Sequence, residues 1–173
     1  MINLEYKDEK IAFVNIRKND LPVVLKWYNN VDEYMFATGI DKPLTLDELK
    51  KRYMETAISH YDFFAWLVND NNDKIGVIKG SIKQKEKDSI WINSLLVDIK
   101  YRKNGYGRCA VDALVKYIKQ HLVMNKVYVS VVEDNLNGII FWNKVGFLKL
   151  RQMDKRIILA GIPRDIIIMY KEI

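Results

Sequence analysis

The sequence SIWINSLLVDIKYRKNGYGR, residues 89–108, joins an apolar run to a basic segment that contains two glycines. Its first nine residues are rich in β-branched and aromatic side chains and predict a β-strand over 89–97. The glycines are Gly105 and Gly107, and the basic residues around them are Arg102, Lys103 and Arg108. Such a cluster is either a solvated surface turn or a backbone cradle for an anion, so the neighbouring segments must distinguish the two interpretations.

The glycine pair lies between that strand and a predicted helix that starts near Gly105. Apolar residues follow at helical spacing, at Tyr106, Ala110, Leu114, Tyr117 or Ile118, and Leu122. The first turn of a helix has unpaired N–H groups and the positive end of the helix dipole, so it favours an anion. The pattern is neither the P-loop nor the dinucleotide fingerprint, because it lacks a Lys-Ser/Thr pair and a third glycine. We therefore expect an anion site of another kind.

Length and composition exclude several classes of protein. The 173 residues fit one domain spanning 1–173, and an apolar fraction of 49% is too high for a disordered chain. No apolar run approaches the ~20 residues of a membrane span, so we expect no membrane partner. The first residues are charged from the fifth position, which argues against a signal peptide.

The small number of cysteines and histidines limits metal and redox chemistry. Cys109 is the only cysteine, which excludes internal disulfides and fits a reducing cytoplasm. His60 and His121 are far apart in the sequence, so we expect no metal. The net charge of +6 favours an anionic partner. Neither a zinc finger nor a basic helix with a zipper occurs, so we expect no nucleic-acid partner.

The remaining segments predict an α/β (α+β) domain. Segments of strand character occur at 10–17, 63–68, 74–82, 89–97, 126–132, 147–153 and 165–171. Segments of helical character occur at 20–29, 45–58, 106–122 and 135–144. Turns are expected at 69–73 and 83–88, and a loop holding Gly161 and Pro163 joins the last two strands.

A second motif supports the first. The segment NLNGIIFWNKVGF, residues 135–147, combines an asparagine, a small residue, an aromatic pair, a lysine and a closing Gly-Phe. Together with LLVDIKYRKNGYG it resembles the two signatures of the GCN5-related N-acetyltransferase (GNAT) superfamily, in the right order and with a helix and a strand between them. The resemblance covers nearly the whole chain. It implies a mixed, mostly antiparallel sheet of about six to seven strands, with two splayed parallel strands and about four flanking helices.

The resemblance implies acetyl-CoA as the co-substrate. The strands 89–97 and 126–132 are the pair that would separate around the pantetheine arm. The pyrophosphate would bind the loop residues Arg102, Lys103, Asn104, Gly105, Tyr106, Gly107 and Arg108. The pantetheine arm would contact backbone groups of Leu95 and Val97 and the side chain of Asn135, and Leu96 and Lys144 are further cofactor-binding residues. The Val97 amide, or that of Leu96, would polarise the thioester carbonyl.

The implied reaction is direct attack of a neutral amine on the thioester, which needs a base and an acid. The family's tyrosine acid is replaced here by Trp142, and indole cannot serve as an acid near neutral pH. The family's glutamate base has no counterpart, because Trp91 and Ser130 stand at the matching positions. Glu133 is our candidate base, with helix capping by Glu133 and its neighbour Asp134 as the alternative role. Other acid–base or water-holding candidates are Asp88, Asn93, Ser94, Asp98 and Tyr106.

The acceptor pocket is expected around residues 27–43, because the first two helices shape it in the family. This segment combines aromatic residues with carboxylates, which suits a cationic amine, but it also fits an ordinary helix–loop–helix surface. We assign Glu33, Tyr34 and Phe36 to the acceptor. The implied acceptor is a small-molecule amine, an aminoglycoside-like amine or a protein N-terminus, and a homodimer through the C-terminal strands follows from the same resemblance. The alternative function is an acyl-CoA-binding module with weak or no catalysis.

Overall fold

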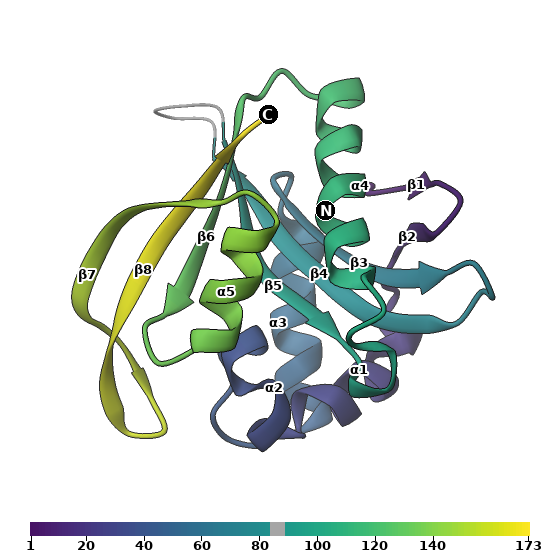
Figure 1. Cartoon of the computed structure of the whole chain (residues 1–173). Helices are drawn as coiled ribbons and strands as arrows, with labels where there is room; N and C mark the ends of the chain where they lie inside the picture. The colour runs from purple at the N-terminus through teal and green to yellow at the C-terminus, as the bar shows by residue number, and fades with distance from the viewer. Residues whose placement is uncertain (84–88) are drawn as a thin grey trace.

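The computed structural model describes residues 1–83 and 89–173, and these form a mixed sheet of eight strands (Figure 1). The strand order is β1-β2-β3-β4-β5-β6-β8-β7. The strands are β1 (Tyr6–Lys7), β2 (Ile11–Asn15), β3 (Asp62–Asn69), β4 (Lys74–Lys83), β5 (Ser89–Val97), β6 (Lys126–Val132), β7 (Leu148–Leu159) and β8 (Ile162–Glu172). All neighbours are antiparallel except β5 and β6, which are parallel.

Five α-helices in the described residues cover the two faces of the sheet. They are α1 (Leu21–Tyr28), α2 (Val31–Thr38), α3 (Leu46–Ile58), α4 (Tyr106–His121) and α5 (Leu136–Lys144), with 3₁₀ turns at Lys18–Asp20 and Ile99–Tyr101. One core joins α4 and α5 to the sheet, and a second core joins α1, α2 and α3 to β3, β4 and β5 on the other face. Figure 1 shows α4 and α5 in front of the sheet and α3 behind it. The predicted α/β fold is confirmed.

The counts of strands and helices exceed the prediction by one each. The additional strand β1 has two residues, too few to show an alternating pattern. The additional helix α2 lies in the segment that we expected to be a link. Its side chains are mostly exposed or half-buried, and Tyr34 is its one buried residue, so it lacks a clear apolar stripe. It ends at Gly39, whose φ of 69° is left-handed.

The expected loop between the last two strands is a tight hairpin. The strands β7 and β8 pair as far as Leu159 and Ile162, and only Ala160 and Gly161 form the turn. Both turn residues have positive φ, which matches the twist of a two-residue hairpin. Pro163 lies within β8, opposite Ile158, on a stretch that has no pairing with β6, so its missing N–H costs no ladder bond on that side. The turn predicted at 83–88 lies, from residue 84 on, outside the described residues.

Candidate functional site

The parallel strands β5 and β6 separate in the middle of the sheet. They pair over four residues, the last pair being Ile92 and Val129, although β5 continues to Val97 and β6 to Val132. The neighbouring strand β4 pairs with β5 on both sides of Asn93 but skips Asn93 itself, which is a β-bulge. Because a bulge bends its strand and increases the local twist, it accounts for the change of direction of β5. The predicted pair of splayed parallel strands is confirmed.

The backbone of β5 presents polar groups without a strand partner to this opening. The Asp98 N–H donates to the Ile75 carbonyl of β4 at 2.8 Å. In an antiparallel pair, alternate residues direct their N–H and C=O groups to the same neighbour. The backbone N–H and C=O of Leu96 therefore point to β4, as those of Asp98 do. The backbone groups of Leu95 and Val97 point the other way, toward β6. Leu95 and Val97, assigned to the pantetheine arm, thus have backbone groups on the edge where the strands have separated, whereas the amide of Leu96, considered for the thioester carbonyl, does not.

The glycine loop ends at the N-terminus of α4 with free amides. The N–H groups of Gly105, Tyr106, Gly107 and Arg108 have no hydrogen-bond partner among the described residues. Gly105 has a φ of 83°, and a Cβ added there would meet nothing within 4 Å. The loop therefore combines the positive end of a 16-residue helix with open space in front of it.

Arg102 connects this loop to β5 and to α2. Its Nε donates to the Val97 carbonyl at 3.0 Å, and its guanidinium pairs with Glu33. The same guanidinium lies 5.1 Å from the centroid of the Tyr34 ring, and the Tyr34 hydroxyl accepts from the Ile99 N–H at 3.1 Å. Glu33 and Tyr34 were assigned to the acceptor, and the structure places both against the loop. Phe36, the third residue of that assignment, is 40% exposed on α2.

The other basic residues of the loop differ in their contacts. Arg108 donates through Nη2 to the Lys144 carbonyl at 2.5 Å, so it joins the start of α4 to the end of α5. The side chains of Lys103 and Lys144 are exposed. Asn104 is exposed as well, and Tyr106 is half-buried with its ring edge-on to Tyr101 at 6.4 Å. The cationic groups of Lys103 and Lys144 are thus available to a bound anion.

The second motif builds α5 and its connection to the core. The Asn135 Oδ1 accepts from the Gly138 N–H at 2.9 Å and caps the helix. Helix capping therefore belongs to Asn135, which corrects the capping role considered for Glu133 and Asp134. Glu133 instead accepts from Gln152 of β7 at 3.1 Å, and Asp134 pairs with Arg164 of β8. Asp88, considered above as an acid–base candidate, lies outside the described residues.

Trp142 is part of the core. It is 9% exposed, and its ring lies edge-on to Phe141 at 5.0 Å and to Phe147 at 4.9 Å. An indole packed in this way stabilises the contact between α5 and the sheet. It places no hydroxyl group at the position where the family's tyrosine is expected.

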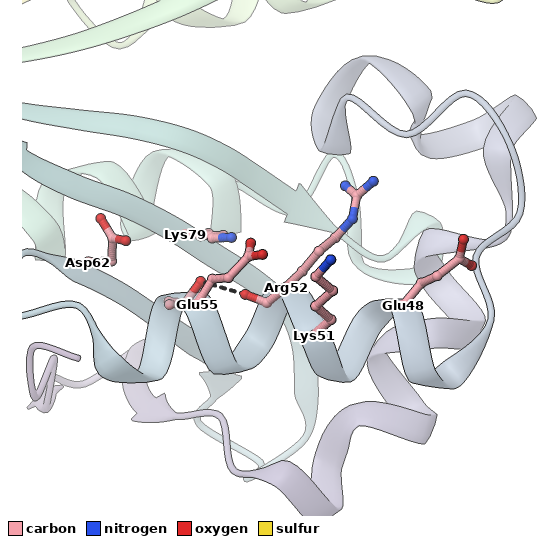
Figure 2. Close-up of a pocket in the computed structure, with 7 residues that line it drawn as sticks. Glu48, Lys51, Arg52, Glu55, Asp62 and Lys79 are labelled. Atoms are coloured by element: carbon pink, nitrogen blue, oxygen red, sulfur yellow. Dashed lines mark hydrogen bonds between the residues drawn. The ribbon is translucent and has the colours of Figure 1, made fainter.

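Two hollows lie on the opposite face of the sheet, between α3 and strands β3, β4 and β5. The outer hollow, of about 560 Å³, is lined by Glu48, Lys51, Arg52, Glu55, Thr56, Asp62 and Lys79 (Figure 2). The inner hollow, of about 140 Å³, is lined by Tyr28, Thr38, Ile40, Leu49, Arg52, Tyr53, Thr56, Phe64, Lys79, Asn93 and Ser94. The two share Arg52, Thr56 and Lys79, and the inner one reaches the bulge of β5. This hollow therefore approaches the splayed strands from the face opposite α4.

Our sequence reasoning missed most of the residues that line these hollows. Glu48, Arg52 and Glu55 lie on one face of α3, at positions i, i+4 and i+7, which is also the pattern of a solvated helix face. Lys79 offered a clearer signal, because a lysine in the middle of the strand KIGVIKGSI rarely lies inside a protein without a function. Asn93 and Ser94 were candidates for holding a water, and the structure places both at the inner hollow.

A family model described as an acetyltransferase (GNAT) domain matches residues 13–166. The chain belongs to the GNAT acetyltransferase family. The splayed strands and the glycine loop are thus the GNAT features that its two sequence motifs predict, and the match covers all elements from β2 to the start of β8.

Solved GNAT structures share the fold of this chain at low identity. The spermidine N-acetyltransferase from Vibrio cholerae, in complex with CoA and spermine, has a TM-score of 0.82 and 16% identity, covering 95% of this chain and 96% of that chain. An acetyltransferase from Salmonella typhimurium that modifies the N-terminal serine of a 50S ribosomal subunit protein has a TM-score of 0.83 and 14% identity, covering 96% of each chain.

Sequence similarity to curated proteins is shorter. The spermine/spermidine N(1)-acetyltransferase of Bacillus subtilis (strain 168) is 24% identical over 58 residues, which is 34% of this chain and 38% of that protein. The match thus spans little more than a third of the relative's length. Within residues 1–83 and 89–173, no cluster of three or more His, Cys, Asp or Glu side chains is placed to hold a metal, and no helix is long and apolar enough to cross a membrane.

Proposed function

We propose that the protein is an acetyl-CoA-dependent N-acetyltransferase that moves an acetyl group to a primary amine. The observation that carries the proposal is the opening between β5 and β6, which begins beyond Ile92 and Val129 and leads to the free amides of Gly105–Arg108. Membership in the GNAT family supports the same reaction class. We place the protein in the cytoplasm, in keeping with its single cysteine.

The residues around the opening fit acetyl-CoA. The free amides at the start of α4 and the open space over Gly105 suit a pyrophosphate, with Lys103 and Lys144 adding charge. The outward-facing backbone groups of Leu95 and the N–H of Val97 can pair with an extended arm in the manner of an added strand, while the Val97 carbonyl already accepts from Arg102. Asn135 retains a free side-chain NH₂ after capping α5 and can donate it to the same arm.

In the proposed reaction the amine nitrogen attacks the thioester carbonyl carbon. A C–N bond forms, the C–S bond breaks, the amine loses a proton to a base, and the departing thiolate gains one. The N–H groups of Leu95 and Val97 can stabilise the negative charge that develops on the carbonyl oxygen. Leu95 is the nearer of the two to the point where the strands separate.

The reaction needs one group that protonates the thiolate and another that deprotonates the amine. Trp142 has no acidic group, so the thiolate would take its proton from solvent or from another side chain. Glu133 remains our candidate base, although its carboxylate contacts Gln152. A thiolate is a fair leaving group even without an acid, so positioning of the two substrates can supply most of the rate.

We propose that the acceptor enters through the hollows on the α3 face. The inner hollow ends at Asn93 and Ser94, at the bulge where β5 leaves β6, so an amine there would meet the thioester from the opposite side of the sheet. The similar structures act on or bind spermidine, spermine and a ribosomal-protein N-terminus. A small amine and a peptide N-terminus are therefore both candidate acceptors.

The buried Trp142 favours a second candidate function. Because no phenol stands at the family's acid position, the fold would serve to bind acyl-CoA with weak or no catalysis. The two candidates share the cofactor site and differ only in turnover.

One pair of measurements tests the proposal. Saturating acetyl-CoA is expected to raise the Tm, and Gly105→Glu is expected to abolish the shift by placing a carboxylate among the free amides. Gly105→Ala is the matched control, because it shares the cost of a positive φ without adding charge. Absence of a shift in the unmodified protein would refute the cofactor site. Release of free thiol with an amine panel then separates the enzyme from the binding module.

The proposal includes a homodimer through the C-terminal strands. The strand β7 is the outer strand of the sheet and exposes Leu148, Leu150 and Ile158. Sedimentation equilibrium at micromolar concentration is expected to give twice the chain mass of 20.4 kDa, and a monomer would contradict the dimer.

A further inference from the structure

The charges of the two hollows on the α3 face are distributed unevenly. The outer hollow has three carboxylates, on Glu48, Glu55 and Asp62, and three cations. The inner hollow has only two charged side chains among the described residues, Arg52 and Lys79, and both are cationic. A ligand thus passes a mixed entrance and reaches a purely positive interior.

Neither cation of the inner hollow forms a direct ion pair among the described residues, and the carboxylates of Asp62 and Glu55 offset the charge of Lys79 only in part. Within the described residues, no carboxylate lies within 4 Å of the Arg52 guanidinium or the Lys79 Nζ. The Nζ of Lys79 lies 5.8 Å from the centroid of the Phe64 ring, a weak contact. Burying an unpaired cation is unfavourable, and burial lowers the pKa of Lys79. An anion entering the hollow would therefore remove an existing penalty.

The two cations lie next to the proposed reacting centre. Lys79 is paired in register with Ser94, one residue beyond the bulge at Asn93. Arg52 of α3 lines the same inner hollow as Lys79, and Figure 2 shows its side chain leaving α3 on the side of the helix that faces the strand of Lys79. The N–H groups at the edge of the opening, on Leu95 and Val97, follow immediately along β5. An anionic group at Lys79 thus lies within a few bonds of an amine at the thioester.

We infer that the acceptor is a primary amine that carries an anionic group, a carboxylate or a phosphate, a few bonds from its nitrogen, and that Arg52 and Lys79 bind this group. The inference rests on the proposed function and specifies its substrate class. A carboxylate or phosphate can accept from both cations, and an arginine can bind such a group with two parallel hydrogen bonds. The inner volume of about 140 Å³ has room for an anionic group and a short spacer.

The same arrangement disfavours polyamines. A spermidine placed with one nitrogen at the thioester would bring further ammonium groups near Arg52 and Lys79, where like charges repel. The similar spermidine N-acetyltransferase therefore shares the fold of this chain, while the inner hollow points to an acceptor of opposite charge.

Matched amines test the inference. We would measure thiol release with leucine and its amide, with O-phosphoethanolamine and ethanolamine, and with spermidine. Each pair differs in the anionic group, so the two arms separate a carboxylate from a phosphate acceptor. At least one anionic amine is expected to have a kcat/KM at least about tenfold above that of its neutral counterpart and that of spermidine. A tenfold ratio corresponds to the loss of one charge-assisted hydrogen bond.

Variants link the preference to the hollow. Lys79→Met and Arg52→Gln are each expected to lower kcat/KM for the anionic amine about 10- to 100-fold and to leave the acetyl-CoA-induced Tm shift unchanged. Lys79→Arg retains the charge and is expected to keep most of the activity. If Lys79 were instead the catalytic base, this substitution would abolish the activity. Lys50→Gln is the matched control, because Lys50 lies on the same helix, pairs with Asp47 and lines neither hollow.

Binding is measured in parallel, so that a lack of turnover is also informative. The same amines are titrated calorimetrically into protein saturated with CoA. A preference for neutral amines or spermidine, equal binding within each pair, or an anionic preference unaffected by Lys79→Met and Arg52→Gln would each overturn the inference. Failure of acetyl-CoA to raise the Tm would instead refute the proposed function itself.

Discussion

Gly76 of β4 lies against the carbonyl of Leu96 on β5, so closely that a Cβ added at residue 76 would lie 2.1 Å from the carbonyl oxygen. This contact sets the position of β5 immediately beside Leu95 and Val97. The edge that faces the opening therefore depends on a residue without a side chain on the neighbouring strand.

Gly76→Ala is expected to lower the free energy of unfolding by about 3 kcal/mol, because the obstructing atom is backbone and one strand must move. Gly39→Ala is the control, since Gly39 has a φ of 69° and open space around it. That control is expected to cost about 1 kcal/mol from the left-handed conformation alone. Urea unfolding of both variants measures the difference, and equal losses would show that β4 and β5 adjust without cost.

Asn135 can be tested separately as a helix cap and as a cofactor contact. Asn135→Asp keeps an oxygen that accepts from the Gly138 N–H but removes the free NH₂. We expect unchanged stability and a KM for acetyl-CoA that is about three- to tenfold higher. This factor corresponds to the free energy of one lost hydrogen bond. Asn135→Ala is expected to lose about 1 kcal/mol of stability as well. An unchanged KM in Asn135→Asp would restrict this residue to its capping role.

The free energy of unfolding is expected to depend on pH through Lys79. Burial lowers the pKa of Lys79 below its ordinary value of 10.5. Between the lowered pKa and 10.5 the unfolded chain binds more protons than the folded one, so the free energy of unfolding contributed by Lys79 rises with pH. Below the lowered pKa the protonated side chain destabilises the fold.

Lys79→Met removes this contribution. We expect the variant to gain stability relative to the unmodified protein at pH 7 and to lose part of that advantage near pH 10, as measured by urea unfolding. Lys50→Met, which changes a lysine outside the hollows, serves as the control. A Lys79→Met difference that does not change with pH would show that Lys79 titrates alike in the folded and unfolded chain.

Trp142 distinguishes the enzyme from the binding module. Trp142→Tyr restores a phenol at the family's acid position, and Trp142→Phe removes the same indole without adding a hydroxyl. Both variants are expected to lose about 1–3 kcal/mol of stability, because the ring packs between Phe141 and Phe147. The kcat of Trp142→Tyr is expected to exceed that of Trp142→Phe about 100-fold or more, the lower end of the range for general acid catalysis. Equal kcat values would show that the phenol at this position transfers no proton.

The fold was largely predictable from the sequence, because long apolar strands and a helix with a continuous stripe identify themselves by periodicity. The strands β3 to β6 and the helix α4 follow in this way. The short strand β1 and the helix α2 did not, because neither has a clear apolar pattern. The segment with Gly161 and Pro163 was expected to be a loop, whereas the strands pair as far as Leu159 and Ile162 and leave only Ala160 and Gly161 in the turn.

The cofactor side of the candidate site and its acceptor side differ in how far the sequence describes them. The glycine loop is contiguous in the chain, and its position between a strand and a helix indicated the free amides directly. The sequence by itself thus determined the family and the anion-binding loop, because their signals are local.

Only the tertiary structure decided which residues share the acceptor hollow. Arg52 and Lys79 come from α3 and β4, and Asn93 from β5, so folding alone brings them together. Likewise, Glu33 and Tyr34 contact the loop because α2 packs beside it, a placement that no local pattern encodes. Spacing along the chain sets which groups share one element, but long-range strand pairing and helix packing set which groups face one another.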